Sequence, residues 1–315
     1  AAGAGPPKMA FAQLVAALAF RPTASPARRT NINMMEHDTS TLELKAQILQ
    51  VAALTDRGQR LNTLIAPTYQ EKRATMSELV AALPPSTVDE AGLAGEWELV
   101  YSDVELFRSS PFFLAIEAAL DSSPDIPQLG KWLGLTDPTK KSALFFKLHQ
   151  LQVLSWGTST VGRVAQRLDF EAGLLESSFD TIIFGLTVVP LLGWGKLLPT
   201  FGGRVLTEAD GLKLEGDELV MELQRTKVLT CPGVDRLPLL DGVFMDRWYP
   251  VNAVWKLLPW NGGPFDGRPP VCRMRVVYLD EHMRISRDAG GGLFVYTRPM
   301  AAPTARGPGG ADDTA

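Results

Sequence analysis

The sequence predicts a mainly β fold, an antiparallel β-barrel that follows an N-terminal helical hairpin. Three observations predict it. From Gly95 onward, apolar residues alternate with polar ones, as they do in strands that bury one face. Turn residues interrupt this alternation at short intervals, and about eight to ten short antiparallel strands of this kind form a barrel or a sandwich. Before Gly95, the apolar residues recur at the spacing of a helix instead.

Two helical segments are expected within residues 38–86. The residues from Ser40 to Glu43 form a capping box, in which the serine hydroxyl and the glutamate carboxylate each satisfy a backbone amide. This motif predicts a helix that begins there and ends at Gly58. A second helix is expected to follow and to stop at the proline pair 84–85, which cannot continue it.

The strand with the clearest alternation covers residues 96–102. Trp97, Leu99 and Tyr101 are expected on one of its faces, and polar residues on the other. The remaining strands are expected at 147–156, 162–171, 174–184, 204–209, 212–215, 218–229, 271–279, 282–287 and 293–298.

Glycines mark two of the expected turns. Asp210 and Gly211 predict a hairpin turn, because both central positions of a type I′ turn need a positive φ. The glycines 290–292 are expected to turn the chain before the last strand. Nothing places them at the N-terminus of a helix, where a phosphate would bind, so we interpret them as serving backbone geometry.

Two apolar segments interrupt the strands. Residues 109–120 predict a short amphipathic helix that carries Phe112 and Phe113. Residues 181–203 contain one charged side chain, Lys196, but also prolines and glycines that make them a poor transmembrane helix. They are interpreted either as an inner strand with a packed loop or as a flap that touches lipid. On the second interpretation, the predicted membrane contacts are Phe112, Phe113, Trp194 and Lys196.

The two ends of the chain differ in composition from the rest. Residues 1–37 carry four basic residues before the first acidic one, Glu36, and are rich in alanine, serine and threonine. This composition predicts an organelle transit peptide; a secretory signal is the alternative, but Arg28 and Arg29 follow the apolar run instead of preceding it. Residues 300–315 predict a disordered tail.

Composition argues against several kinds of chemistry. The net charge is −4 and no run of basic residues occurs, so no nucleic-acid partner is expected. Cys231 and Cys272 lack metal-ligand spacing and predict a reduced pair over a single disulfide. The three histidines, His37, His149 and His282, are also isolated. We therefore expect no metal, no cofactor and no catalytic residue; an enzyme would depend on His149.

Three segments resemble the plastid lipid-associated protein (fibrillin) family: "AALTDRG" at 52–58, "LAGEWELVYSDVELFRSSPFF" at 93–113 and "VVYLDEHMRISRDAGGGLFVYTR" at 276–298. Residues 95–97 also resemble the Gly-x-Trp that opens lipocalin barrels. The resemblance implies a lipocalin-like barrel over 93–299 and a location on the stromal side of the chloroplast, peripheral to thylakoids or plastoglobules. It also implies an apolar lipid ligand, such as an acyl lipid, a prenylquinone or a carotenoid.

The predicted ligand-binding residues are Trp97, Leu99, Tyr101, Tyr278, Arg284 and Phe294. For Arg284 two interpretations are open: it faces the interior, where it pairs with a lipid head group or stacks on Trp97, or it forms a cross-strand ion pair. Two functions are likewise open. The barrel binds lipid at a membrane or lipid-droplet surface, or it is filled and acts as a scaffold for a protein partner, such as a prenyl-lipid enzyme or a photosynthetic complex.

Overall fold

The computed structural model describes residues 26–62, 66–121, 142–143, 145–146, 161–183, 201–230, 245–255 and 269–299. The chain divides into two compact units, 1–45 and 46–315, and the second contains every strand. Helix α1, Pro26–Leu54, extends across this division. Ser40 therefore lies inside α1, and the prediction that a helix begins there is wrong, because the residues before Ser40 already have helical backbone.

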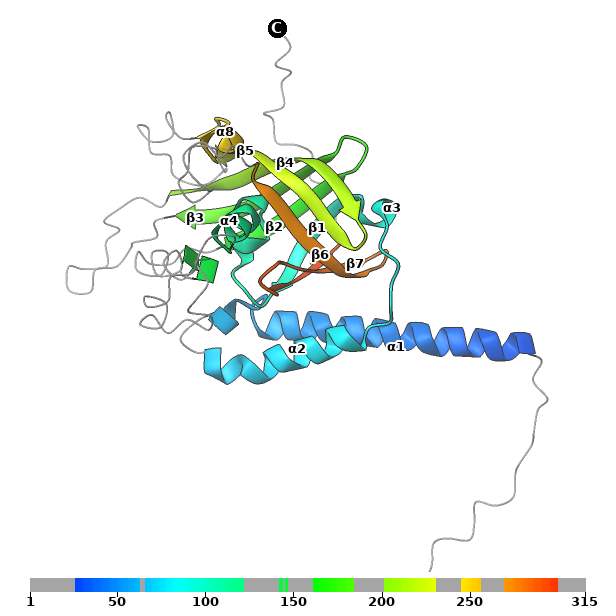
Figure 1. Cartoon of the computed structure of the whole chain (residues 1–315). Helices are drawn as coiled ribbons and strands as arrows, with labels where there is room; N and C mark the ends of the chain where they lie inside the picture. The colour runs from blue at the N-terminus through cyan, green and yellow to red at the C-terminus, as the bar shows by residue number, and fades with distance from the viewer. Residues whose placement is uncertain are drawn as a thin grey trace, which may run out of the picture. The chain divides into compact units, whose positions relative to one another are not determined.

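Eight antiparallel strands close into a barrel, which confirms the predicted fold class (Figure 1). Each strand pairs with the next in sequence, and the last pairs with the first, so the sheet has no free edge. The strands are β1 Gly95–Ser102, β2 Val161–Asp169, β3 Leu174–Ile183, β4 Phe201–Glu215, β5 Glu218–Thr230, β6 Val271–Leu279, β7 Met283–Arg287 and β8 Leu293–Thr297.

The helices and short 3-10 turns of the second unit precede β1 or lie in the connections between strands. The apolar segment predicted as a helix is α4, so that prediction is confirmed. The expected strand 147–156 and the expected tail 300–315 lie outside the described residues. After α1, the elements are η1 Gln59–Asn62, η2 Ala66–Tyr69, α2 Gln70–Ala82, α3 Glu90–Leu93, η3 Leu106–Ser109, α4 Pro111–Asp121 and α8 Val251–Trp255.

The two ends of the barrel differ in the length of their connections. At the end where β1 begins, which we call the Trp97 end, short turns join β2 to β3, β4 to β5 and β6 to β7. At the opposite end, which we call the mouth, long connections join β1 to β2, β3 to β4 and β5 to β6. Both apolar segments of the sequence, 109–120 and 181–203, therefore attach to the barrel at the mouth.

The predicted turn at Asp210 and Gly211 is wrong, because β4 continues through both residues. The pairing of β4 with β5 shifts register between Asp210 and Lys213, and Gly211 has a φ of +64°. A bulge of this kind accommodates a positive φ without ending the strand. The chain turns instead at Gly216, where φ is +68°.

Residues 56–58, which follow α1, fasten this part of the chain to the outside of the barrel. All three have positive φ, between +53° and +83°. The Arg57 carbonyl accepts a hydrogen bond from the Ser102 amide at 3.0 Å, and Arg57 Nη1 donates to the Gly162 carbonyl at 2.6 Å. A Cβ on Gly58 would lie 1.8 Å from the Ser102 oxygen, so only glycine fits there.

Replacing Gly58 with alanine tests this attachment. We expect Gly58→Ala to lower the free energy of unfolding by more than about 3 kcal/mol. The added methyl group would push the backbone of β1 away, and alanine is also strained at this positive φ. Gly216→Ala is the matched control, since Gly216 has a positive φ but an added methyl group would have no atom within 4 Å. Its expected cost is about 1–2 kcal/mol. Urea unfolding measures both, and equal losses would contradict the steric argument.

Candidate functional site

The side chain of Arg284 crosses the interior of the barrel. It originates on β7, and its Nη2 donates a hydrogen bond to Oε1 of Gln166 on β2, a strand that is not a neighbour of β7. The guanidinium carbon lies 4.0 Å from the centre of the Tyr296 ring and 5.4 Å from that of Trp97. Arg284 is fully buried, at 0% exposure. The interpretation that it faces the interior is therefore confirmed.

Several buried polar atoms beside Arg284 have no hydrogen-bond partner. They are Nε and Nη1 of Arg284 itself and the hydroxyl groups of Ser177, Ser286 and Tyr296. Arg284 and Ser109 lie near the Tyr296 hydroxyl, but outside hydrogen-bond geometry. Unsatisfied donors around a buried charge are costly, so this group requires an explanation beyond packing. We call the polar centre the residues Gln166, Ser177, Arg284, Ser286 and Tyr296.

Desolvation sets the protonation states in the polar centre. Burial lowers the pKa of Arg284 to about 10, while the nearby Tyr296 hydroxyl opposes that shift. Burial likewise raises the pKa of Tyr296 to about 12, against the effect of the Arg284 charge. At neutral pH, Arg284 is therefore positively charged and Tyr296 keeps its proton. The polar centre is rich in donors and carries one positive charge.

A β-bulge turns Tyr101 away from this interior. Leu99 pairs with Tyr296, but Tyr101 pairs with Val295, the adjacent residue of β8. Adjacent residues of a strand point to opposite faces, so Leu99 lies inside and Tyr101 lies on the outer face. The prediction that Trp97, Leu99 and Tyr101 share one face is wrong for Tyr101, because the bulge adds one residue to β1.

A second bulge, between Val276 and Tyr278 of β6, turns the Tyr278 side chain to the outer face. Val276 pairs with Ser286 of the polar centre, whereas Tyr278 pairs with Ile285, which points to the outer face. The Tyr278 hydroxyl donates to the Asp280 carboxylate, and burial followed by this contact raises its pKa. Tyr278 therefore cannot contact a ligand in the interior. Of the six predicted ligand-binding residues, the structure brings together Trp97, Leu99, Arg284 and Phe294.

The side chains inside the described barrel are almost wholly removed from solvent. Trp97, Phe294 and Tyr296 are each 0% exposed, and apolar side chains from all strands except β7 form one continuous core around them. Water reaches almost none of this surface. The interior around these side chains is therefore apolar and shielded from water.

Arg298 closes the Trp97 end. Its guanidinium carbon lies 3.8 Å from the centre of the Trp97 ring, and its N–H groups donate to the carbonyls of Gly92, Ala94 and Glu96 at 2.7, 2.7 and 3.2 Å. Trp97 Nε1 in turn donates to the Leu93 carbonyl at 2.8 Å. Arg298 was not predicted from the sequence. The feature that could have indicated it is a basic residue directly after β8, the strand that pairs with the Gly-x-Trp strand β1.

Helix α4 covers part of the mouth, where it packs against β4, β5 and β6 (Figure 1). The Cys272 thiol on β6 donates to the Pro111 carbonyl at 3.0 Å. Phe113, Leu114 and Ile116 are all buried, as expected for a helix with apolar residues on most sides. Immediately before α4, the Ser109 carbonyl accepts a hydrogen bond from Gln166 Nε2 at 2.8 Å. The start of α4 is therefore joined directly to the polar centre.

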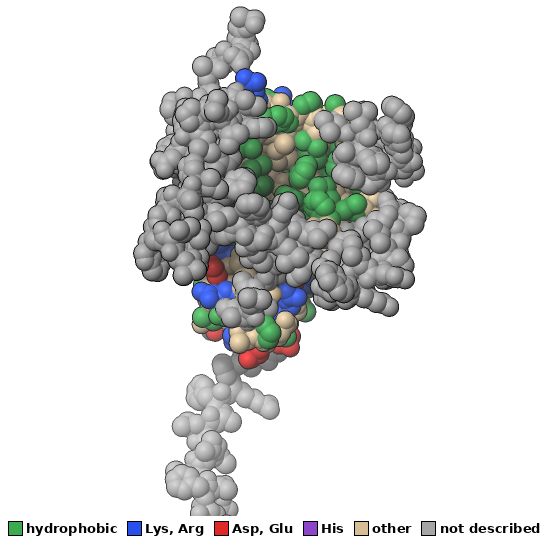
Figure 2. Space-filling view, turned by 90° about the vertical axis from the view of Figure 1, so that its left-hand side faces the viewer, with side chains coloured by type: hydrophobic (Ala, Val, Ile, Leu, Met, Phe, Trp, Pro, Cys, Tyr) green, Lys and Arg blue, Asp and Glu red, His purple; other side chains and the backbone are tan. Residues whose placement is uncertain are grey.

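The predicted membrane contacts lie in different environments. Phe113 is only 8% exposed, and its ring centre lies 4.6 Å from that of Phe107 and 5.1 Å from that of Phe112. Phe113 is thus a core residue, while Phe112 is half-buried. Figure 2 looks toward the end where β3 terminates, and hydrophobic side chains gather there in a hollow. Trp194 and Lys196 lie outside the described residues.

A buried ion cluster holds α4 to the turn between β7 and β8. Arg108 Nη2 lies 2.8 Å from the Glu117 carboxylate of α4 and 3.2 Å from that of Asp288. Burial raises the pKa of Asp288, and the charge of Arg108 opposes this shift. A Cβ on Gly290 would lie 2.4 Å from Glu117, and one on Gly292 would lie 2.7 Å from Asp288. Gly290 and Gly292 therefore make room for this cluster.

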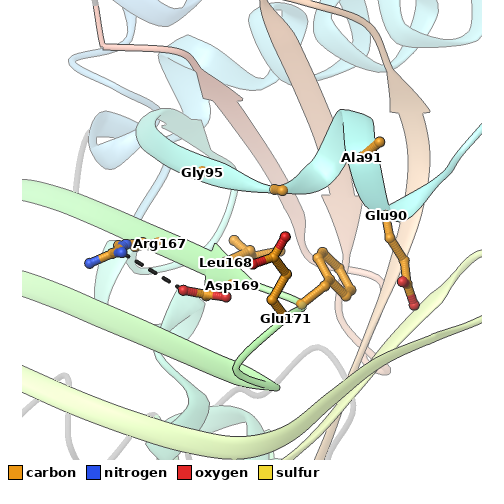
Figure 3. Close-up of a pocket in the computed structure, with 9 residues that line it drawn as sticks. Glu90, Ala91, Gly95, Arg167, Leu168, Asp169 and Glu171 are labelled. Atoms are coloured by element: carbon orange, nitrogen blue, oxygen red, sulfur yellow. Dashed lines mark ion pairs between the residues drawn. The ribbon is translucent and has the colours of Figure 1, made fainter.

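A surface pocket of about 350 Å³ lies outside the barrel at the Trp97 end (Figure 3). It is bounded by α3 and the end of β2, and the Arg167 guanidinium on its wall lies 3.8 Å from the Asp169 carboxylate. Its lining side chains do not point toward a common position where a ligand group could be held. None of the residues that line it belongs to the polar centre. The lining residues are Glu90, Ala91, Ala94, Gly95, Arg167, Leu168, Asp169, Phe170 and Glu171.

The described part of the chain lacks the groups that other kinds of site require. It contains no group of three or more histidine, cysteine or acidic side chains placed to hold a metal ion. Cys272 is a free thiol whose pKa is raised by burial, so it is protonated at neutral pH. Within the same residues, no helix combines the length and apolarity needed to cross a bilayer.

No family model, curated protein or solved structure matches this chain. The likeness to the fibrillin family therefore remains a prediction that depends on the sequence segments alone.

Removing the Arg298 guanidinium tests the closure of the Trp97 end. We expect Arg298→Met to lower the free energy of unfolding by about 2–4 kcal/mol, because three carbonyls lose a charged donor. Arg273→Met is the control, since Arg273 is half-exposed and pairs with Glu215 and Glu218 at the surface. Its expected effect in urea unfolding is below about 1 kcal/mol. Similar losses in both variants would exclude a closing role for Arg298.

The ion cluster predicts a dependence on pH. Asp103 and Asp288 both have pKa values raised by burial, and Arg108 opposes both shifts. Arg108→Met should cost about 3–5 kcal/mol at pH 7, because buried carboxylates lose their counter-charge. Carboxylates with raised folded pKa values bind protons more readily folded than unfolded, so the cost should shrink as the pH falls towards about 5.

Unfolding measured at both pH values checks this prediction. Arg275→Met, which removes an exposed ion pair with Asp217, should give the same small loss at each pH. A loss in Arg108→Met that did not change with pH would show that the raised pKa values have another origin.

Proposed function

We propose that this chain binds or organises apolar lipids at a thylakoid or plastoglobule surface, on the stromal side of the chloroplast and without catalysing a reaction. The observation that carries the proposal is the packing of α4, an apolar helix, over β4, β5 and β6 at the barrel mouth. The segments that resemble fibrillins support the same proposal, since 93–113 contains β1 and the start of α4.

Helix α4 occupies the route by which an apolar chain would enter. Phe113, Leu114 and Ile116 belong to the same apolar core as Trp97 and Phe294 inside the barrel. An acyl or prenyl chain that replaced these side chains would make apolar contacts with the barrel in their place. Each methylene of the chain that leaves water contributes about 0.8 kcal/mol to binding. Binding therefore requires α4 to move outward, and the lost helix packing offsets part of the gain.

The segment between β3 and β4 is proposed to dock on the membrane. It begins and ends at the mouth, and it contains Trp194 and Lys196 among apolar residues. Aromatic and basic side chains of this kind suit the boundary between head groups and acyl chains. Half-buried Phe112 lies at the same end of the barrel and would add to the contact.

A scaffold is the second candidate function, and the complete burial of the interior side chains favours it. Trp97, Arg284, Phe294 and Tyr296 are all fully buried among their neighbours. On this proposal the barrel never opens, and its outer surface or mouth supports a partner, such as a prenyl-lipid biosynthetic enzyme or a photosynthetic complex.

Mass spectrometry of lipids extracted from the protein, isolated from its own organelle, distinguishes the two functions. Lipid binding predicts about one lipid for each chain, enriched over a control protein from the same preparation. A chain isolated without lipid, but with a stoichiometric protein partner, would support the scaffold and exclude the carrier.

The docking segment can be removed without disturbing the strands. Ile183 and Phe201 are a register pair of β3 and β4, so an Asn-Gly turn in place of 184–200 would join them as a tight hairpin. We expect this variant to lose at least about tenfold in binding to thylakoid-lipid vesicles, because its interfacial aromatic and basic side chains are gone. Flotation of the vesicles measures this loss.

The double variant Trp194→Ser, Lys196→Ser is the matched control, since it keeps the length of the segment. It should lose most of the same binding, while circular dichroism and the urea midpoint of both variants stay unchanged. Full vesicle binding by the hairpin variant would reject the docking role.

A further inference from the structure

We infer that the polar centre is the head-group subsite of the barrel and that it takes the carboxylate of a single-chain lipid. This inference rests on the proposed lipid binding and names the class of lipid. It follows from three properties of the polar centre: its charge, its unsatisfied donors and its position under α4.

The charge of the polar centre is not balanced by any acidic group. Among the described residues, no carboxylate lies within ion-pair distance of Arg284, and the guanidinium makes one hydrogen bond, to neutral Gln166. The nearest other cation, Arg298, adds to the positive potential. A buried cation without a counter-ion is stabilised by an anion that enters with its ligand.

The guanidinium carries donors that no acceptor in the polar centre satisfies. Nε and Nη1 of Arg284 can only donate, and the hydroxyls of Ser177, Ser286 and Tyr296 are able to donate as well. A carboxylate only accepts, and its two oxygens match the planar fork of an arginine. Because the centre has one positive charge, it suits a monoanion better than a phosphate monoester, which carries up to two negative charges at neutral pH.

The position of the polar centre explains how a head group reaches it. Gln166 bonds Arg284 through its oxygen and the Ser109 carbonyl through its nitrogen, so one side chain joins the guanidinium to the start of α4. When α4 moves outward, the Ser109 bond breaks and the polar centre opens toward the mouth. The lipid tail would then run from Arg284 past Cys272 to the position that Phe113 leaves.

The test uses the full chain, stripped of lipid, and titrates it with oleate and with methyl oleate, which has the same tail but no charge. Isothermal calorimetry measures both affinities. We expect the unmodified chain to bind oleate at least about tenfold more tightly than methyl oleate, because a buried charged hydrogen bond of this kind contributes about 1.5–3 kcal/mol. In Arg284→Met the preference should disappear while methyl oleate binds as before.

Arg273→Met is the matched control, and it should keep the preference because Arg273 is half-exposed on the outer surface. Equal affinity of the unmodified chain for the two probes would overturn the head-group subsite and leave lipid binding intact. Failure to bind either probe would instead count against the proposed function itself.

A second measurement needs no variant, in case Arg284→Met does not fold. Oleate labelled with ¹³C at its carboxyl group reports its own ionisation by NMR when bound to the unmodified chain. Pairing with Arg284 should keep the bound carboxylate ionised at a pH at which oleate in vesicles is already protonated. A bound carboxyl that titrated as it does in vesicles would place the head group away from Arg284 and overturn the inference.

Discussion

The pairing of the last strand with the first is the interaction on which the rest of the molecule depends. Once β8 pairs with β1, every strand of the described barrel has two neighbours. The same pairing places Tyr296 beside Leu99, and Arg298 beside Trp97. Two segments nearly two hundred residues apart in sequence therefore build one end of the barrel.

Two bulges then divide the aromatic side chains of the wall between its two faces. Trp97 and Tyr296 remain with the polar centre, while Tyr101 and Tyr278 point outward. The outer face near Tyr101 receives the turn at Gly58, and the inner face receives Arg284. Attachment of the preceding helices and organisation of the interior thus depend on different residues of the same strands, and each can be altered without the other.

How far the sequence predicts this arrangement depends on whether a feature is local. Alternation of apolar and polar residues predicts the strands, and with them the interior positions of Trp97, Leu99 and Phe294. A bulge depends on the register of the partner strand, so the outward orientation of Tyr101 and Tyr278 could not be read from β1 or β6 alone. Arg298 was missed for the same reason, because its partners lie about two hundred residues earlier.

The reactivity of the buried Cys272 thiol depends on whether α4 covers it. Its sulfur lies against the Pro111 carbonyl, at the first turn of the helix that must leave for anything to enter. An alkylating reagent can reach that sulfur only in the fraction of molecules in which α4 has moved away. The rate of labelling therefore follows the population of the open state, and a lipid tail lying against the sulfur would slow it.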